Sequence, residues 1–312
     1  MAVIVNTNVQ SLIAQKNLSN STNAMNTATK RLSTGMKINN AVDDAAGLFI
    51  AKGLETQLSG SKQCQTNLSL GVNVLQIAEG DLSTIQDNIM RIKDLATQAS
   101  NGVYSTSAQK AMSDEVEARL AEINRVAAAS NFNGMELFTE NAPEEMRLQV
   151  GAGSDAAANS ITIEGVFGSL VTSAAVGGGG LGLDGTVTFG ANFKDAAGVQ
   201  FKNKNNEAID SIEKLFQSAT ACAIYIQKCE DAINEISEKR SNIGVIQSRL
   251  EMASQGLATT IENISAAKST IMDTDIAATT AEYTQKQILQ QISSSMLLQA
   301  IQAPSVALSL LG

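Results

Sequence analysis

Apolar residues recur every seven positions along the C-terminal half of the chain, which predicts one long helix with a continuous apolar seam. A seven-residue apolar repeat held over many turns keeps one side of a helix facing a partner, as in coiled coils. Residues 215–271 are therefore expected to pack in a coiled-coil-like manner. The repeat comprises Leu215, Cys222, Cys229, Ile236, Ile243, Leu250, Leu257, Ile264 and Ile271.

The N-terminal half carries a matching repeat of Leu68, Leu75, Leu82, Ile89 and Ala96. The small residues Gly71 and Ala78 lie between these positions and predict that another helix approaches closely there. A third helix is predicted over residues 106–129, after an Asn-Gly turn within residues 101–107. Helices with complementary seams of this kind predict a rod-like bundle.

Helices with wide apolar faces are also predicted at both ends of the chain. Such a face is too broad to leave in water, so each terminal helix needs a partner. We expect the two helices to cover each other and then to contact neighbouring molecules, and we expect Pro304 to end the C-terminal helix. The candidate assembly residues on these faces are Leu18, Met25, Leu32, Leu289, Ile292 and Met296.

Between the helices the pattern changes to an alternation of apolar and polar residues, which predicts β-strands. Residues 146–150 and 161–163 alternate in this way around the loop sequence GAGSD and predict a β-hairpin. Residues 165–205, which include a tetraglycine at 177–180, predict a small β-rich insert. The expected fold class is mainly α: an elongated, coiled-coil-like helical bundle built from both chain ends, with a β-hairpin and a small β-rich central insert.

Charge divides the chain in the same way as the helical pattern. The net charge is −9, yet residues 1–42 carry no acidic side chain, and residues 283–312 carry only Lys286 as a charged residue. The two ends therefore form one chemical class and the middle another. The net negative charge also argues against nucleic acid as a partner, because binding to phosphates requires clustered cations.

This partition predicts a domain built from both ends of the chain. The expected domains are an inner terminal-helix domain of residues 1–42 plus 272–312, a helical-bundle domain with the β-hairpin of residues 43–164 plus 206–271, and a short variable surface insert of residues 165–205.

The 312 residues include no histidine, which removes the commonest general base, Ser–His–Asp systems and every histidine-containing metal site. We therefore predict no enzyme, no cofactor and no metal. Asp43 and Asp44 could form a metal or acid–base pair, but they fit better the first turn of a helix, where carboxylates complement the dipole. Asp273 and Asp275 are interpreted in the same way.

The three cysteines have two interpretations. Cys222 and Cys229 belong to the seven-residue series and Cys64 to the facing one, so buried apolar thiols are favoured. A redox role stays open if Cys64 packs opposite either of the others. The tetraglycine lacks the Lys-Ser/Thr pair of a phosphate-binding loop and is interpreted as a flexible loop.

The first ten residues, MAVIVNTNVQ, lack the basic region and long apolar core of a secretory signal peptide. No stretch approaches the roughly 20 apolar residues that a membrane span requires. By the general export pathway the chain is therefore expected to remain in the cytosol.

Several long motifs, in the correct order, resemble the bacterial flagellins, and the resemblance covers about three quarters of the chain. The motifs are IVNTNVQSLIAQKNL at 4–18, LSTGMKINNAVDDAAGLFIA at 32–51, FNGMELF at 132–138, SNIGVIQSRLEMA at 241–253 and ENISAAKSTIMDTDIA at 262–277.

This resemblance implies a subunit that self-assembles through its terminal helices into the bacterial flagellar filament. It implies export as a largely unfolded chain by the flagellar type III apparatus, with an export chaperone, and contact with the filament cap and junction proteins. It also implies that the polar, Gly35-containing joint at residues 32–51 lets the inner helices fold only when neighbours cover their apolar faces.

The resemblance further implies recognition by the animal Toll-like receptor for flagellin. The segment MRIKDLA at 90–96 is similar to the family's receptor-contacting motif, which places the contact on Arg91 and Leu95, with Glu115 on the neighbouring helix. The alternative is that these residues are exposed helix positions that contact the next subunit.

The sequence is also compatible with two other functions. The hook–filament junction protein shares the terminal helices of the family, although the motifs at 132–138 and 241–253 favour flagellin. A secreted host-interacting effector is the third possibility, since basic termini without acidic residues would suit a membrane surface.

Overall fold

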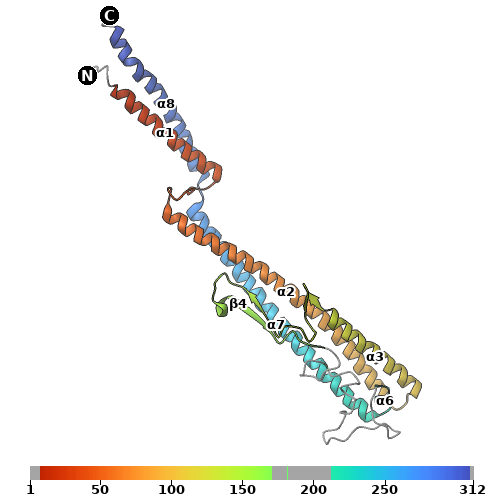
Figure 1. Cartoon of the computed structure of the whole chain (residues 1–312). Coiled ribbons are helices and arrows are strands. Elements are labelled where there is room, and N and C mark those ends of the chain that lie inside the picture. Colours follow the sequence, from red (N-terminus) through yellow and green to blue (C-terminus); the bar gives the residue numbers. More distant parts are fainter. Residues whose placement is uncertain (1–7, 171–180, 182–211, 310–312) are drawn as a thin grey trace. The chain divides into compact units, whose positions relative to one another are not determined.

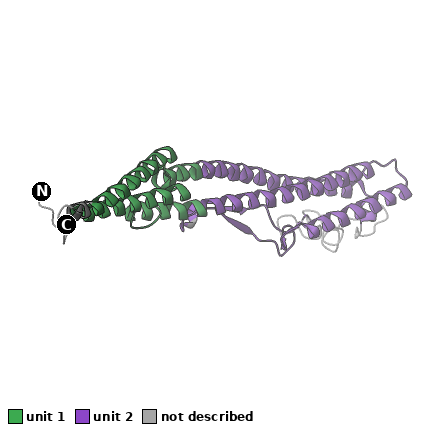
Figure 2. Cartoon of the chain, turned by 90° about the horizontal axis from the view of Figure 1, so that it is seen from above, with its two compact units in different colours: residues 1–59, 260–312 green, residues 60–259 purple. Residues whose placement is uncertain are grey.

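Long helices make up most of this computed structural model, which describes residues 8–170, 181 and 212–309 (Figure 1). The chain forms two compact units (Figure 2). We call Met1–Ser59 with Thr260–Gly312 the terminal unit and Gly60–Thr259 the central unit. The terminal unit is thus built from both ends of the chain, while the finer domain division at residues 42 and 272 stays a prediction.

The terminal unit contains helix α1 (Val9–Thr34) and helix α8 (Ile276–Ser309), which lie side by side (Figure 1). Helix α1 begins where the side chain of Asn8 accepts a hydrogen bond from the backbone N–H of Ser11, at 3.0 Å. It ends at Gly35, whose φ of 71° is the left-handed conformation that glycine adopts without steric cost.

The expected end of the C-terminal helix at Pro304 is wrong, since α8 runs on to Ser309. A proline inside a helix leaves the carbonyl four residues earlier without its N–H donor. That carbonyl belongs to Ala300, and it accepts a hydrogen bond from Asn8 Nδ2 at 2.7 Å. A side chain from the other terminal helix therefore satisfies the acceptor that Pro304 leaves open.

The polar joint after α1 pairs with the segment that precedes α8. The backbone N–H of Lys37 donates to the carbonyl of Met272 at 2.7 Å, and that of Thr274 donates to the carbonyl of Gly35 at 2.9 Å. A small core forms beneath this bridge from Ile38, Ala51 and Met272. The joint is thus an ordered β-bridge with its own apolar contacts.

Two further long helices contribute to both units: α2 (Ala45–Ala99) and α7 (Ala219–Met272). In the central unit they lie side by side, and α3 (Thr106–Ala129) packs with them (Figure 1). The predicted seams are confirmed, because nearly all of their members are buried. They include Leu68, Leu75, Leu82, Ile89 and Ala96 on α2, and Cys222, Cys229, Ile236, Ile243 and Leu250 on α7.

One member of the C-terminal series, Leu215, lies outside α7. It is the last residue of a separate short helix, α6 (Ile212–Leu215), and it is fully buried. Its carbonyl accepts a hydrogen bond from Cys222 Sγ at 3.5 Å, which joins the two helices. The periodicity therefore identified the buried position but not the break in the helix.

Two small antiparallel sheets follow α3. Strands β1 (Asn131–Phe132) and β2 (Met135–Glu136) flank Asn133 and Gly134, whose φ values of 51° and 81° suit a tight hairpin. Strands β3 (Glu145–Gln149) and β4 (Ser160–Glu164) form the predicted β-hairpin, with the short helix α4 (Ala156–Asn159) in its loop.

The structure revises the expectation for Gly71. A side chain at this position would collide with Leu148 of β3, so the glycine admits the β-hairpin rather than another helix. The predicted β-rich insert at 165–205 lies mostly outside the described residues, and residues 165–170 contain no strand. Within the described part of the chain, no helix has the length and apolarity needed to cross a membrane.

Candidate functional site

The seam between α1 and α8 is made mainly of small and polar side chains. On α1, Ala14 and Ala28 are buried, and the predicted residues Leu18, Met25 and Leu32 are half-buried. These positions recur at the three- and four-residue spacing of a helix face. The shielded positions on α8 recur in the same way, at Thr279, Tyr283, Lys286, Gln290, Ser293, Leu297 and Ala300.

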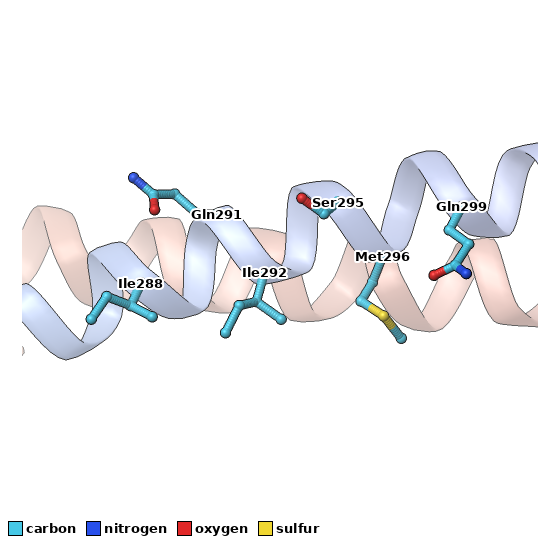
Figure 3. Close-up of a pocket in the computed structure, with 6 residues that line it drawn as sticks. All are labelled: Ile288, Gln291, Ile292, Ser295, Met296 and Gln299. Carbon is cyan, nitrogen blue, oxygen red and sulfur yellow. The ribbon is translucent and has the colours of Figure 1, made fainter.

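The most apolar face of α8 points away from this seam. Ile288, Ile292 and Met296 are about half exposed, at 51%, 52% and 56%, and they project from one side of the helix (Figure 3). We call these three residues the α8 strip. Together with Gln291, Ser295 and Gln299 they line a pocket on the surface of α8. Leu289 is also exposed, at 39%. The predicted α8 residues therefore do not face α1, although the predicted α1 residues do face the seam.

Helix α1 adds a second exposed apolar surface at its first turns. Val9, Leu12 and Ile13 are each more than half exposed. Side chains of this size rarely gather on the surface of a soluble monomer unless the surface contacts a partner. The sequence pattern indicates that both helices are apolar but does not distinguish their paired faces from their open ones.

Arg91 and Glu115 lie side by side in the central unit and bind each other. Arg91 Nε donates to Glu115 Oε1 at 2.9 Å, and Arg91 Nη2 donates to Glu115 Oε2 at 3.2 Å. Their hydrogen bonds and opposite charges raise the pKa of Arg91 and lower the pKa of Glu115. Both side chains remain partly exposed, at 47% and 35%, so this ion pair is presented at the surface.

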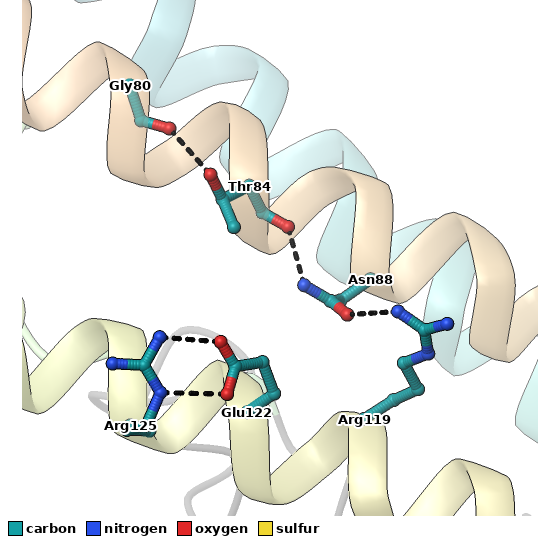
Figure 4. Close-up of polar contacts among 6 residues, drawn as sticks. All are labelled: Gly80, Thr84, Asn88, Arg119, Glu122 and Arg125. Atoms are coloured by element: carbon teal, nitrogen blue, oxygen red, sulfur yellow. Dashed lines mark hydrogen bonds and ion pairs between the residues drawn. The ribbon is translucent and has the colours of Figure 1, made fainter.

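Leu95, the third predicted receptor residue, is only 2% exposed. Its side chain belongs to the core of the central unit and is not part of the folded surface that presents Arg91 and Glu115. Further contacts fix α3 against α2 nearby, since Arg119 Nη1 donates to Asn88 Oδ1 at 3.1 Å (Figure 4). The packing of α3 thus covers a side of α2 that the seven-residue repeat does not include.

The acidic residues at the joints organise the backbone. Asp44 Oδ1 accepts from the N–H of Gly47 just before α2, and Asp275 Oδ1 accepts from the N–H of Ala278 just before α8. Asp43 Oδ2 accepts from the N–H groups of Asn39 and Asn40, each at 3.0 Å, and these bonds lower the pKa of Asp43. Among the described residues, no group of His, Cys, Asp and Glu is arranged to hold a metal ion.

The cysteines are buried and unpaired with one another. Burial raises the pKa of Cys222 and of Cys229 to about 12, so both thiols are protonated and unreactive. Cys229 lies level with Lys93 of α2, because Lys93 binds the adjacent Glu230 at 2.9 Å. Cys64 lies roughly 40 Å further along α2 at the helical rise, which is too far for a disulfide with Cys229.

A helix pair with a thin seam and open apolar faces is typical of structural subunits that contact other molecules through such faces. Comparison with known proteins supplies the family. The family model for the bacterial flagellin N-terminal helical region matches residues 5–142, and the model for the C-terminal helical region matches residues 226–311.

Relatives match over the full length of the chain. The flagellar filament 33 kDa core protein of Treponema phagedenis is 32% identical over 309 residues, covering 99% of this chain and 100% of the relative. Flagellin FlaB1 of Treponema pallidum (strain Nichols) is 32% identical over 312 residues, covering 99% of this chain and 100% of the relative.

A solved structure from Vibrio parahaemolyticus, described as flagellar hook-associated, has a TM-score of 0.50 at 14% identity and covers 74% of this chain and 99% of that one. At this identity it shows a shared fold alone. From the family models and the full-length relatives, the chain belongs to the bacterial flagellin family, the structural subunits of the flagellar filament.

Proposed function

We propose that the chain assembles into the flagellar filament through its terminal unit, with a neighbouring copy covering the α8 strip. The observation that carries this proposal is the row of Ile288, Ile292 and Met296, exposed on the side of α8 that does not face α1. Burial of apolar surface contributes about 25 cal/mol per Å². Such a row, repeated in every subunit, supplies a stabilisation that a single chain lacks.

The six predicted assembly residues then have two roles. Leu18, Met25 and Leu32 hold α1 against α8 within one chain, since they are half-buried in the seam. The exposed residues on α8, Leu289, Ile292 and Met296, form contacts between copies. The first set stabilises the subunit's shape, and the second joins one subunit to the next.

The thin seam also suits the proposed route to the filament. A helix pair that buries few large side chains gains little free energy from folding alone, so it folds on binding to neighbouring subunits. This property is compatible with export of an unfolded chain by the flagellar type III apparatus, with an export chaperone, and with delivery to a growing end between the cap and junction proteins. The expected location is the filament outside the cell.

We also propose that the animal Toll-like flagellin receptor recognises this chain. Arg91 and Glu115 are exposed enough to bind a receptor surface, and they present both charges of one ion pair. Leu95 contributes indirectly, because its buried side chain helps to hold α2 in place. We place the primary contact on the charged pair.

Polymerisation of the full-length chain in a salting-out buffer, followed by electron microscopy, tests the assembly proposal. The Ile292→Asp variant should keep the folded central unit but form no filaments, because a charge on the strip resists burial. Ser294→Asp adds the same charge to an exposed position of α8 outside the strip and should still polymerise. Normal filaments from the Ile292→Asp variant would contradict the proposed contact.

A charge exchange tests the receptor proposal in cells that report receptor signalling. The double variant Arg91→Glu, Glu115→Arg keeps an ion pair between the helices but reverses its direction, so signalling should fall while the fold is kept. The matched control exchanges Glu122 and Arg125, a bidentate exposed pair within α3 (Figure 4). Equal loss of signalling in both double variants would contradict a specific role for Arg91 and Glu115.

A further inference from the structure

One acceptor in the terminal unit lacks its ordinary partner within its own helix. In an α-helix each carbonyl accepts from the N–H four residues later, and for Ala300 that residue is Pro304, which has no N–H. An unpaired carbonyl in a partly shielded seam costs free energy. The helix nevertheless continues to Ser309, so another group must satisfy Ala300.

The side chain of Asn8 supplies the missing donor. Asn8 Nδ2 donates to the carbonyl oxygen of Ala300 at 2.7 Å, while Asn8 Oδ1 accepts from the N–H of Ser11 at 3.0 Å. Both ends of one amide are therefore used, the oxygen to cap α1 and the nitrogen to bind α8. An Asp side chain could provide the first bond, but its carboxylate has no donor for the second.

The seam between α1 and α8 is aligned at one end by the β-bridge of the joint, where Lys37 pairs with Met272 and Thr274 with Gly35. Its buried members on α1 are alanines, and the shielded positions repeat every seven residues on both helices. Away from the joint, small buried side chains such as Ala14 hold the start of α1 with few directional contacts. In such helix pairs a single polar contact can specify the register. Gln290 Nε2 makes a further polar contact across this seam, to Thr22 Oγ1 at 3.2 Å.

We propose that Asn8 is a positioning residue that holds the start of α1 in register on α8, at the end far from the joint, by binding the carbonyl that Pro304 leaves free. The proline creates an acceptor at one point of α8, and only one register brings the start of α1 to it. The contact in turn sets the position of Val9, Leu12 and Ile13 on α8, and we expect these residues to join the α8 strip in contacting a neighbouring copy. This last consequence rests on the proposed assembly function, whereas the contact itself does not.

Hydrogen exchange measured by mass spectrometry on the full-length chain, as monomer and as polymer, tests the proposal through a double-variant cycle. Asn8→Asp keeps the cap acceptor but removes the donor to Ala300. It should lower the protection factors of the amides of Ser11 and Leu12, which are bonded to Asn8, about tenfold. Pro304→Ala restores the N–H within α8, so in that background Asn8→Asp should change protection by about twofold or less. Asn17→Asp, at an exposed position of the same helix, should change it little in either background.

An equal effect of Asn8→Asp in both backgrounds would overturn the proposal, because Asn8 would then act only as a cap or through charge. Lack of protection in α1 of the unaltered chain, in monomer and polymer alike, would also overturn it. Electron microscopy of the same samples reports assembly separately. Failure to form filaments, with the dependence on Pro304 intact, would count against the assembly function alone.

Discussion

The two helical parts of this flagellin differ in how completely they bury their apolar residues. In the central unit the seam residues Leu75, Leu82 and Ile89 have no exposed surface. In the terminal unit the buried apolar positions of α1 are two alanines, and the large side chains on α8 are mostly exposed. The same seven-residue spacing thus produces a fully buried core in the central unit and a partly exposed one in the terminal unit.

The difference shows that helical periodicity reports which residues share a face, but not whether that face is covered by the same chain. The central unit contains a third helix, α3, which packs on the α2 side that α7 leaves open. The terminal pair has no such helix among the described residues. We therefore expect stability to depend on core residues in the central unit and on neighbouring molecules in the terminal unit.

The largest expected effect is the loss of a core side chain in the central unit. Ile89→Ala removes a fully buried side chain and should lower the free energy of unfolding by about 2–5 kcal/mol, measured by urea denaturation followed by circular dichroism. Ile77→Ala is the matched control on the same helix, since Ile77 is 39% exposed and its loss should cost much less. Similar losses of unfolding free energy in the two variants would contradict the conclusion that the core of the central unit is fully buried within one chain.

An intermediate effect is expected at the polar link between α2 and α7. Arg240 donates to Glu79 Oε1 through Nε at 2.9 Å and through Nη2 at 2.7 Å. Arg240→Ala leaves this carboxylate without its partner and should cost about 1–2 kcal/mol in urea denaturation, less than a fully buried pair because both groups are one-third exposed. Arg125→Ala breaks a more exposed pair within α3 and should cost about 0.5 kcal/mol or less.

A smaller effect is expected at the joint of the terminal unit when the pH falls. The hydrogen bonds from Asn39 and Asn40 lower the pKa of folded Asp43 below 3.8, so its contribution is complete above that value. The contribution is lost as the pH decreases through the folded pKa. The protection factors of amides at the joint, which correct for the pH dependence of intrinsic exchange, should therefore fall below about pH 4. In Asp43→Asn this acid dependence should be weaker. The same pH dependence of exchange in the variant would contradict the role of Asp43.

The smallest effect on the single chain is expected on the α8 strip. Ile292→Ala removes an apolar side chain that is already 52% exposed, so the free energy of unfolding of the monomer should change by about 0.5 kcal/mol or less. The critical concentration for polymerisation should nevertheless rise. A loss in the monomer as large as that of Ile89→Ala would mean that the strip is already covered within one chain, and the comparison between the two units would fail.

Much of the fold could be predicted from the sequence, because repeats of seven and of two residues follow directly from helix and strand geometry. The seams of α2 and α7, the bounds of α3 and the β3–β4 hairpin are confirmed. The composition also made the absence of histidine-based chemistry evident. These properties depend on neighbouring positions in the chain, which a single sequence records.

Other features depend on contacts between distant segments, and they were decided by the tertiary structure alone. Leu95 is 2% exposed although it lies outside the seven-residue repeat of α2, so the repeat does not record its burial. The strip on α8 is open because α1 packs on a different face. Pro304 is accommodated because Asn8, 292 residues away from Ala300, donates to the carbonyl that the proline leaves free. The sequence by itself determined which residues are apolar and how they are spaced; which partner covers each of them was settled only by the packing of the helices, since that depends on segments far apart in the chain.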